Sequence, residues 1–141
     1  ISTAKSYKEV ICRRLNSIID AHAWIEYFIG SDKGNEVKKI VESENNEVFT
    51  SIITIAEVVS ITKRENRDAE QKYLDMVNLS KIYGINLDLA KEAGILHAEV
   101  RKTIKDFGLA DAIVLSTARK LGAKIVTGDP HFKGFKEAIL I

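Results

Sequence analysis

Cysteine, which forms the disulfides of secreted proteins and the thiolate ligands of metal sites, is scarce in this chain. Its 141 residues include a single cysteine, Cys12, so no disulfide can form within the chain. One cysteine and three histidines at these spacings also exclude the usual zinc-binding patterns. A lone thiol is most often a buried or inconsequential side chain, and it is typical of a reducing compartment. We therefore expect a cytoplasmic protein.

Proline, long apolar runs and blocks of like charge are also scarce. The chain has one proline, no apolar run of membrane-spanning length and no signal-peptide core. Its 21 basic and 20 acidic residues give a net charge of +1, which neither requires nor excludes a nucleic-acid partner. Its composition is that of a globular domain long enough to bury a core. We expect one domain over residues 17–141, preceded by residues 1–16 as an N-terminal extension or a remnant of an added sequence.

Short β-rich runs alternate with longer stretches of helical periodicity. The expected strands are 17–19, 48–50, 85–87, 124–127 and 139–141. The expected helices are 23–29, 34–45, 54–64, 69–83, 88–103 and 109–121, of which 54–64 should be largely buried. This alternation predicts an α/β fold with three layers, α/β/α, around a mostly parallel sheet. In such sheets, ligands bind beyond the carboxyl ends of the strands.

Two aspartates follow predicted strands directly. Asp20 comes after 17–19, and Asp129 comes after 124–127 with a single glycine between. Aspartate is also an ordinary turn residue, and Pro130 marks a turn, so each residue taken alone has a simple structural explanation. Both should nevertheless lie at the same edge of the sheet.

Two further acids lie on predicted apolar helices. Glu57 has Ile53 and Ile61 four residues to either side, which places its carboxylate in an apolar stripe. A buried carboxylate needs a cation, which could be Lys63, Arg64 or a metal ion. Asp111 begins the apolar helix 109–121, where an acid also stabilises the helix N-terminus.

Four carboxylates at one edge would repel each other unless a cation lies between them. Hard oxygen ligands favour Mg²⁺ or Mn²⁺, and these ions promote phosphodiester hydrolysis. The sequence has no nucleophile elbow, Walker A loop or dinucleotide-binding glycine motif that would indicate another chemistry.

Four segments in order resemble the PIN domains, including the VapC-type toxins of toxin–antitoxin pairs. They are Ile18-Ile19-Asp20, Thr54-Ile55-Ala56-Glu57-Val58, Leu109 to Ala118, and Ile125-Val126-Thr127-Gly128-Asp129-Pro130-His131-Phe132. The resemblance implies a metal-dependent ribonuclease of single-stranded RNA using Mg²⁺ or Mn²⁺. The family's acidic positions, both catalytic and metal-binding, fall on Asp20, Glu57, Asp111 and Asp129.

The resemblance also assigns supporting residues and partners. Thr127 matches a polar residue that often supports the last acid. Many members carry a small hydroxyl or amide side chain just after the first aspartate, where this chain has Ala21 and His22. His22 could take that polar role or could simply be a surface histidine, whereas His97 and His131 read as structural. The resemblance to VapC-type PIN domains implies a homodimer and an antitoxin protein as partner.

Two other functions remain open from the residues. The fold could serve as a catalytically inactive binding or scaffold module, although all four acidic positions are filled. A receiver-like or phosphatase domain is less consistent, because it needs a lysine after a later strand and Lys124 instead begins its strand.

Overall fold

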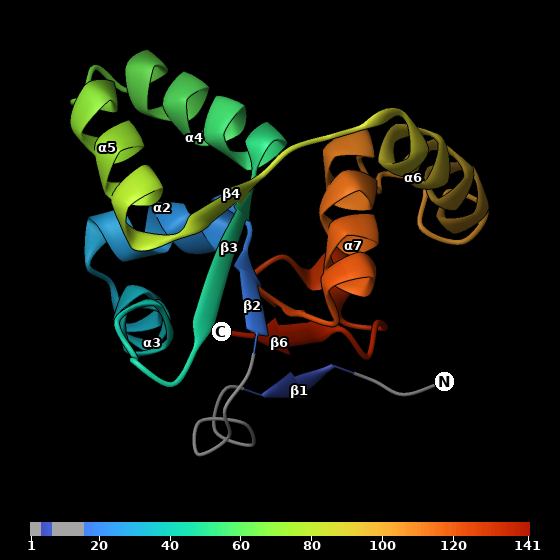
Figure 1. Cartoon of the computed structure of the whole chain (residues 1–141), viewed down its shortest axis with the longest axis horizontal. Coiled ribbons are helices and arrows are strands. Elements are labelled where there is room, and N and C mark those ends of the chain that lie inside the picture. Colours follow the sequence, from blue (N-terminus) through green and yellow to red (C-terminus); the bar gives the residue numbers. More distant parts are fainter. Residues whose placement is uncertain (1–3, 7–15) are drawn as a thin grey trace.

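The computed structural model describes residues 4–6 and 16–141. Six strands and seven helical segments follow one another along this part of the chain, and Figure 1 shows their arrangement. The strands are β1 (Lys5–Ser6), β2 (Asn16–Ile19), β3 (Glu47–Ser51), β4 (Lys81–Tyr83), β5 (Lys124–Thr127) and β6 (Ala138–Leu140). The α-helices are α2 (Ala21–Ile29), α3 (Asp32–Val41), α4 (Ile52–Arg64), α5 (Ala69–Leu79), α6 (Leu87–Val100) and α7 (Leu109–Leu121), and a 3₁₀ turn, η1, covers Pro130–Phe132. The expected α/β fold is confirmed.

The strands form one sheet in the order β1-β6-β5-β2-β3-β4, and every pair of neighbours is parallel. In the centre, β2 pairs with β5 so that Ile19 lies opposite Val126. All strands therefore end at the same edge. The residues that follow β2 and β5 emerge there side by side.

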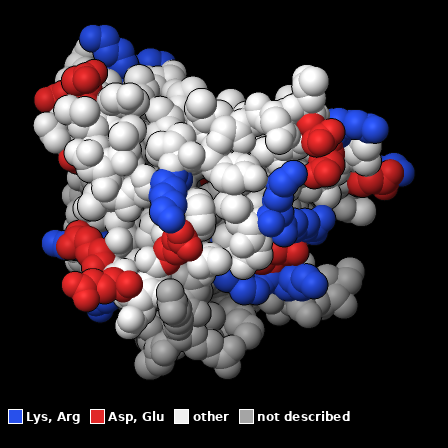
Figure 2. All heavy atoms as spheres, in the orientation of Figure 1, with Lys and Arg blue, Asp and Glu red and all other residues white. Residues whose placement is uncertain are grey.

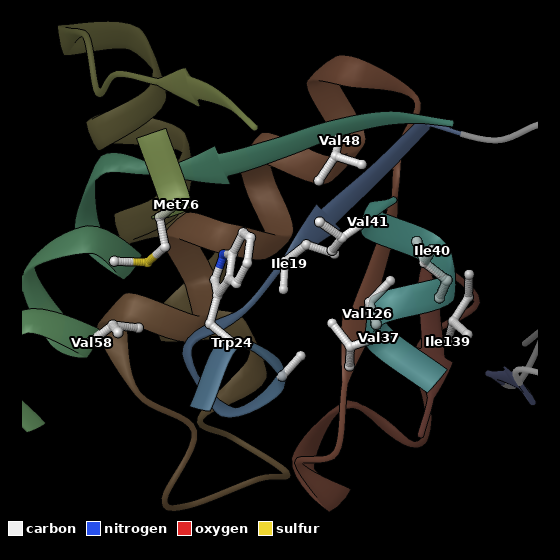
Figure 3. Packing of buried hydrophobic residues seen from close by; sticks show 11 residues of the cluster. Ile19, Trp24, Val37, Ile40, Val41, Val48, Val58, Met76, Val126 and Ile139 are labelled. Carbon is white, nitrogen blue, oxygen red and sulfur yellow. The ribbon is translucent and has the colours of Figure 1, made fainter. Parts of the chain in front are cut away.

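Helices cover both faces of the sheet, because successive strand residues point to opposite sides. Ile19 and Val126 face a core built on α2, α3, α4 and α5, in which Trp24 is fully buried (Figure 3). Ile18 and Ile125 face a second core built on α7 and the phenylalanines of the neighbouring loops. This confirms the three-layer arrangement.

The segment after α5 differs from the expectation. The helix predicted to reach Tyr83 ends at Leu79, and residues 81–83 form β4 instead of the expected strand at 85–87. The apolar spacing of α5 continues through Ile82, which predicts a longer helix. Residues 81–83 form a strand instead, because they pair with β3. Helix α6 begins at Leu87, one residue before the expected start, and Asn86 caps it by accepting a hydrogen bond from the Leu89 amide.

Helix α4 was expected to be largely buried, but only one of its faces is. Thr54, Val58 and Thr62 are buried, whereas Ile52 is 49% exposed. The remaining sides are only partly covered. One of them, with Glu57 and Ile61, lines a cleft described below.

The proposed extension at residues 1–16 stays a prediction. Residues 1–3 and 7–15, including Cys12, lie outside the described residues. Within the described part, no helix is long and apolar enough to cross a membrane.

Candidate acidic active site

A cleft of about 300 Å³ opens where β2 and β5 end. Its walls contain all four acids singled out from the sequence together with apolar side chains. The lining residues are Asp20, Ala21, His22, Ile25, Glu57, Ile61, Asp111, Val114 and Asp129. Two of the acids follow strands and two lie on helices, so the cleft depends on the packing of the whole domain.

Asp20 is the most buried of the four acids. It caps α2, and its Oδ1 accepts a hydrogen bond of 2.8 Å from the Ala23 amide. Its own amide donates to the Val126 carbonyl, which continues the β2–β5 pairing by one residue. Burial raises the pKa of Asp20 to about 7, against the opposing effect of hydrogen bonds from Thr127 and Ala23. The charges of Asp111 and Asp129 raise it further.

Thr127 connects the two strand-end aspartates. Its hydroxyl donates to the Asp20 carboxylate, which lowers the pKa of Asp20, and accepts a 2.9 Å hydrogen bond from the Asp129 amide. The Thr127 side chain is fully buried, so bulk water does not compete for either hydrogen bond. The position expected to support the last acid thus contacts the first one as well.

The two helix acids meet across the cleft. Burial, and then the charge of Asp111, raises the pKa of Glu57. Among the described residues, no basic side chain pairs with Glu57, so neither Lys63 nor Arg64 takes the role considered for them. Burial likewise raises the pKa of Asp111, whose Oδ2 accepts a hydrogen bond from the Gly108 amide. Asp111 is therefore both a helix-capping acid and part of the cleft.

His131 was expected to be structural, but it contacts an acid of the cleft. Its Nδ1 lies 2.7 Å from Oδ1 of Asp129, and its Nε2 lies 2.9 Å from Oδ2 of Asp106. The hydrogen bond to Asp106 and the nearby charge of Asp129 raise the pKa of His131. Sequence reasoning missed Asp106, because nothing in the order of residues indicates that it meets His131.

The other two histidines lie at different ends of this region. His22 is exposed at the cleft and packs on Gly128; a Cβ on that glycine would come within 2.4 Å of the His22 ring. His97 instead contacts the Phe107 carbonyl at 3.0 Å, as a structural residue does.

The donor chemistry of the cleft fits a hard divalent cation. Three of its four carboxyl groups have pKa values raised by burial and by one another, and a cation would relieve that repulsion. Among the described residues, no three acidic, histidine or cysteine side chains are already close enough to hold an ion. Binding would therefore draw the carboxylates together.

An all-parallel sheet with acids gathered at its carboxyl edge is the arrangement expected of a PIN domain. The model of the PIN domain family matches residues 17–138, and the chain belongs to that family. No curated protein sequence matches the chain.

Solved structures with the same fold include a toxin–antitoxin complex and a toxin. A toxin–antitoxin complex from Klebsiella pneumoniae is 25% identical and covers 87% of this chain and 95% of that one, with a TM-score of 0.69. VapBC2 from Rickettsia felis, bound to a DNA fragment from their promoter, is 20% identical, covers 90% and 98%, and has a TM-score of 0.68. VapC20 from Mycobacterium tuberculosis, a sarcin–ricin loop cleaving toxin, is 18% identical, covers 79% and 87%, and has a TM-score of 0.63.

Proposed function

We propose that this chain is a metal-dependent endoribonuclease that hydrolyses phosphodiester bonds of single-stranded RNA, and that it is the toxin of a toxin–antitoxin pair. The observation that carries the proposal is the meeting of Asp20, Glu57, Asp111 and Asp129 in one cleft. Membership of the PIN domain family and the fold shared with VapC toxins support it.

The four acids would hold Mg²⁺ or Mn²⁺. When bound, such an ion polarises the phosphate and lowers the pKa of water. With its pKa near 7, the Asp20 carboxyl keeps its proton in a large share of molecules at neutral pH, and metal binding would release that proton. Ile25, Ile61 and Val114 give the cleft an apolar lining, and electrostatic interactions are stronger beside apolar surface than in bulk water.

Thr127 and His22 would have supporting roles. The Thr127 hydroxyl holds Asp20 and Asp129 in a fixed relation, so both carboxylates face the cleft together. The His22 ring lies against Gly128 at the exposed side of the cleft, where it could orient a water molecule.

The test is cleavage of single-stranded RNA by the purified protein with Mg²⁺ or Mn²⁺. Cleavage should stop in excess chelator and be abolished by Asp20→Asn and by Asp129→Asn, because each removes an oxygen charge that the metal needs. Asp88→Asn, which removes an exposed carboxylate in the first turn of α6, is the matched control and should cut like the parent. All variants must be purified identically, since a contaminating ribonuclease would cut without metal.

The alternative is a catalytically inactive binding or scaffold module of the same fold. It would be favoured if the Asp20→Asn and Asp129→Asn proteins cut as fast as the parent, or if cutting continued in chelator. Failure to cut any RNA while Mn²⁺ still binds would favour it as well.

For partners, we propose an antitoxin protein and a second copy of the chain. Trp24 is part of the core, but α5 exposes Tyr73, Leu74 and Val77, and β4 exposes Ile82. Figure 2 shows much uncharged surface around α5 and β4. A homodimer would cover these side chains, and sedimentation that detects only monomer at micromolar concentration would reject it.

A further inference from the structure

His131 lies between two carboxylates that belong to different loops. Its Nδ1 is 2.7 Å from Asp129, in the loop after β5, and its Nε2 is 2.9 Å from Asp106, between α6 and α7. A carboxylate ion only accepts hydrogen bonds, so the ring donates at both nitrogens when both contacts are made. The ring therefore connects the loop that carries Asp129 to the loop that precedes Asp111.

Aromatic packing fixes both ends of this connection. Phe107 and Phe132, the residues next to Asp106 and His131, are fully buried, and their ring centroids are 5.6 Å apart. His97 Nε2 also lies within hydrogen-bond distance of the Phe107 carbonyl. The Asp106–His131 pair thus lies next to the Phe107–Phe132 pair, which is fixed in the core. As a result, Asp106 meets the ring from an anchored backbone even though its side chain is 79% exposed.

The contacts on Asp129 gather on one of its oxygens. Oδ1 accepts from His131 Nδ1 and from the His131 amide at 2.9 Å, while Thr127 Oγ1 accepts from the Asp129 amide. Two donors of the same residue hold this oxygen, which restricts rotation of the carboxylate. Asp129 lines the cleft, so its other oxygen, Oδ2, would keep one direction relative to a ligand bound there.

We propose that His131 is a positioning residue that orients the Asp129 carboxylate toward a cation in the cleft, and that Asp106 acts through His131 by holding its ring. The consequence for RNA cleavage rests on the proposed function. The orientation itself, and its effect on cation binding, do not require that the protein cuts RNA.

Two substitutions of His131 by residues with amide side chains separate its contact with Asp129 from its contact with Asp106. In His131→Asn the side-chain nitrogen falls near the position of Nδ1, so it can still donate to Asp129 but cannot reach Asp106. In His131→Gln the nitrogen falls near Nε2, which preserves the contact with Asp106 and loses the one with Asp129. His131→Ala removes both and leaves the backbone cap of η1 in place.

The experiment measures Mn²⁺ binding by calorimetry on protein without RNA, together with kcat, KM and thermal stability. His131→Ala should weaken Mn²⁺ binding about tenfold, as loss of an outer-shell partner commonly does. His131→Asn should recover most of that loss, and His131→Gln should not. Asp106→Asn should weaken binding about threefold in the parent and add nothing in the His131→Ala protein, because it acts through the ring. In cleavage, the loss should appear in kcat and not in KM.

Asp88→Asn is the control for the removal of one exposed negative charge, and it should leave Mn²⁺ binding unchanged. The proposal is overturned if the Asn and Gln variants bind Mn²⁺ equally well, if Asp106→Asn still weakens binding without His131, or if every loss follows a matching fall in thermal stability. It is also overturned if the parent binds no Mn²⁺. Should Mn²⁺ binding follow the expected order while no variant, nor the parent, cuts RNA, the positioning role stands and the nuclease proposal fails.

Discussion

Asp20 and Asp129 end neighbouring parallel strands and line the same cleft, yet their surroundings differ. Asp20 is 6% exposed and has two like charges nearby, and its pKa is raised to about 7. The Asp129 side chain is 25% exposed and contacts the His131 ring. The comparison teaches that position at a strand end does not make two acids alike: burial raises the pKa of Asp20, whereas Asp129 is held by the His131 ring.

The largest effect should come from Asp20→Asn in the absence of metal. A folded-state pKa above that of the unfolded chain makes the protein less stable as pH rises from about 4 to about 7, because the unfolded chain loses the proton first. Removing the charge should therefore stabilise the protein above pH 7 by ~4 kcal/mol at most. Asparagine keeps the cap on α2. Asp129→Asn should give no such gain, because the hydrogen bond from the His131 ring to a charged carboxylate becomes a weaker one to an amide oxygen.

Urea unfolding in chelator at pH 4 and pH 8 measures the gain from Asp20→Asn. The difference in unfolding free energy between Asp20→Asn and the parent should widen as the pH rises. A difference that is the same at both pH values would show that burial does not raise the pKa of Asp20.

Added metal should stabilise the folded protein, and it should do so more at high pH, where Asp20 is charged. Mn²⁺ at about one hundred times its Kd should stabilise the parent by ~2.7 kcal/mol at pH 8. The same concentration should stabilise it less at pH 5, where Asp20 holds its proton and competes with the ion. Thermal unfolding with and without Mn²⁺ checks this, and equal stabilisation at both pH values would contradict it.

Thr127→Val should affect both aspartates at once. The change keeps the side-chain shape but leaves the Asp129 amide without its acceptor and Asp20 without the Thr127 hydroxyl. We expect a loss of ~1–3 kcal/mol in the free energy of unfolding. Thr127→Ser, which retains the hydroxyl, is the control. A Val variant as stable as the Ser variant would show that the shared hydroxyl is not needed.

The smallest effect should come from Gly128→Ala, on the Asp129 side of the cleft. The new methyl group would meet the His22 ring, but this side chain is exposed and can swing away. The expected loss is below ~1 kcal/mol, in the range of ordinary surface changes. It should disappear when His22→Ala is added. Gly134→Ala, where a methyl group would meet nothing, is the control; a large loss that persists without His22 would mean the clash lies elsewhere.

The sequence predicted the architecture where local signals and tertiary packing agree. The run Ile18-Ile19 forms a buried strand that ends at Asp20, and Gly108 and Gly122 bound the helix that carries Asp111. The parallel sheet followed from the alternation of elements. Because strands of a parallel sheet end at one edge, the shared location of Asp20 and Asp129 could be foreseen.

Contacts between distant segments could not be foreseen. Strand β4 exists because residues 81–83 find a partner in β3, although their apolar spacing continues a helix. The Asp106–His131 contact joins loops that tertiary packing, including that of Phe107 on Phe132, brings together. The catalytic and metal-binding roles of the four acids remain predictions.

The pairing of β2 with β5 also governs when the cleft can exist during protein synthesis. The central strand of the sheet is made early, whereas its neighbour, with Thr127 and Asp129, is made near the end of the domain. Pairing between such distant segments is slow to form and cannot begin before the second one leaves the ribosome. A nascent chain therefore carries Asp20 and Glu57 without their partners, and the activity we propose becomes available only after nearly the whole domain has been translated.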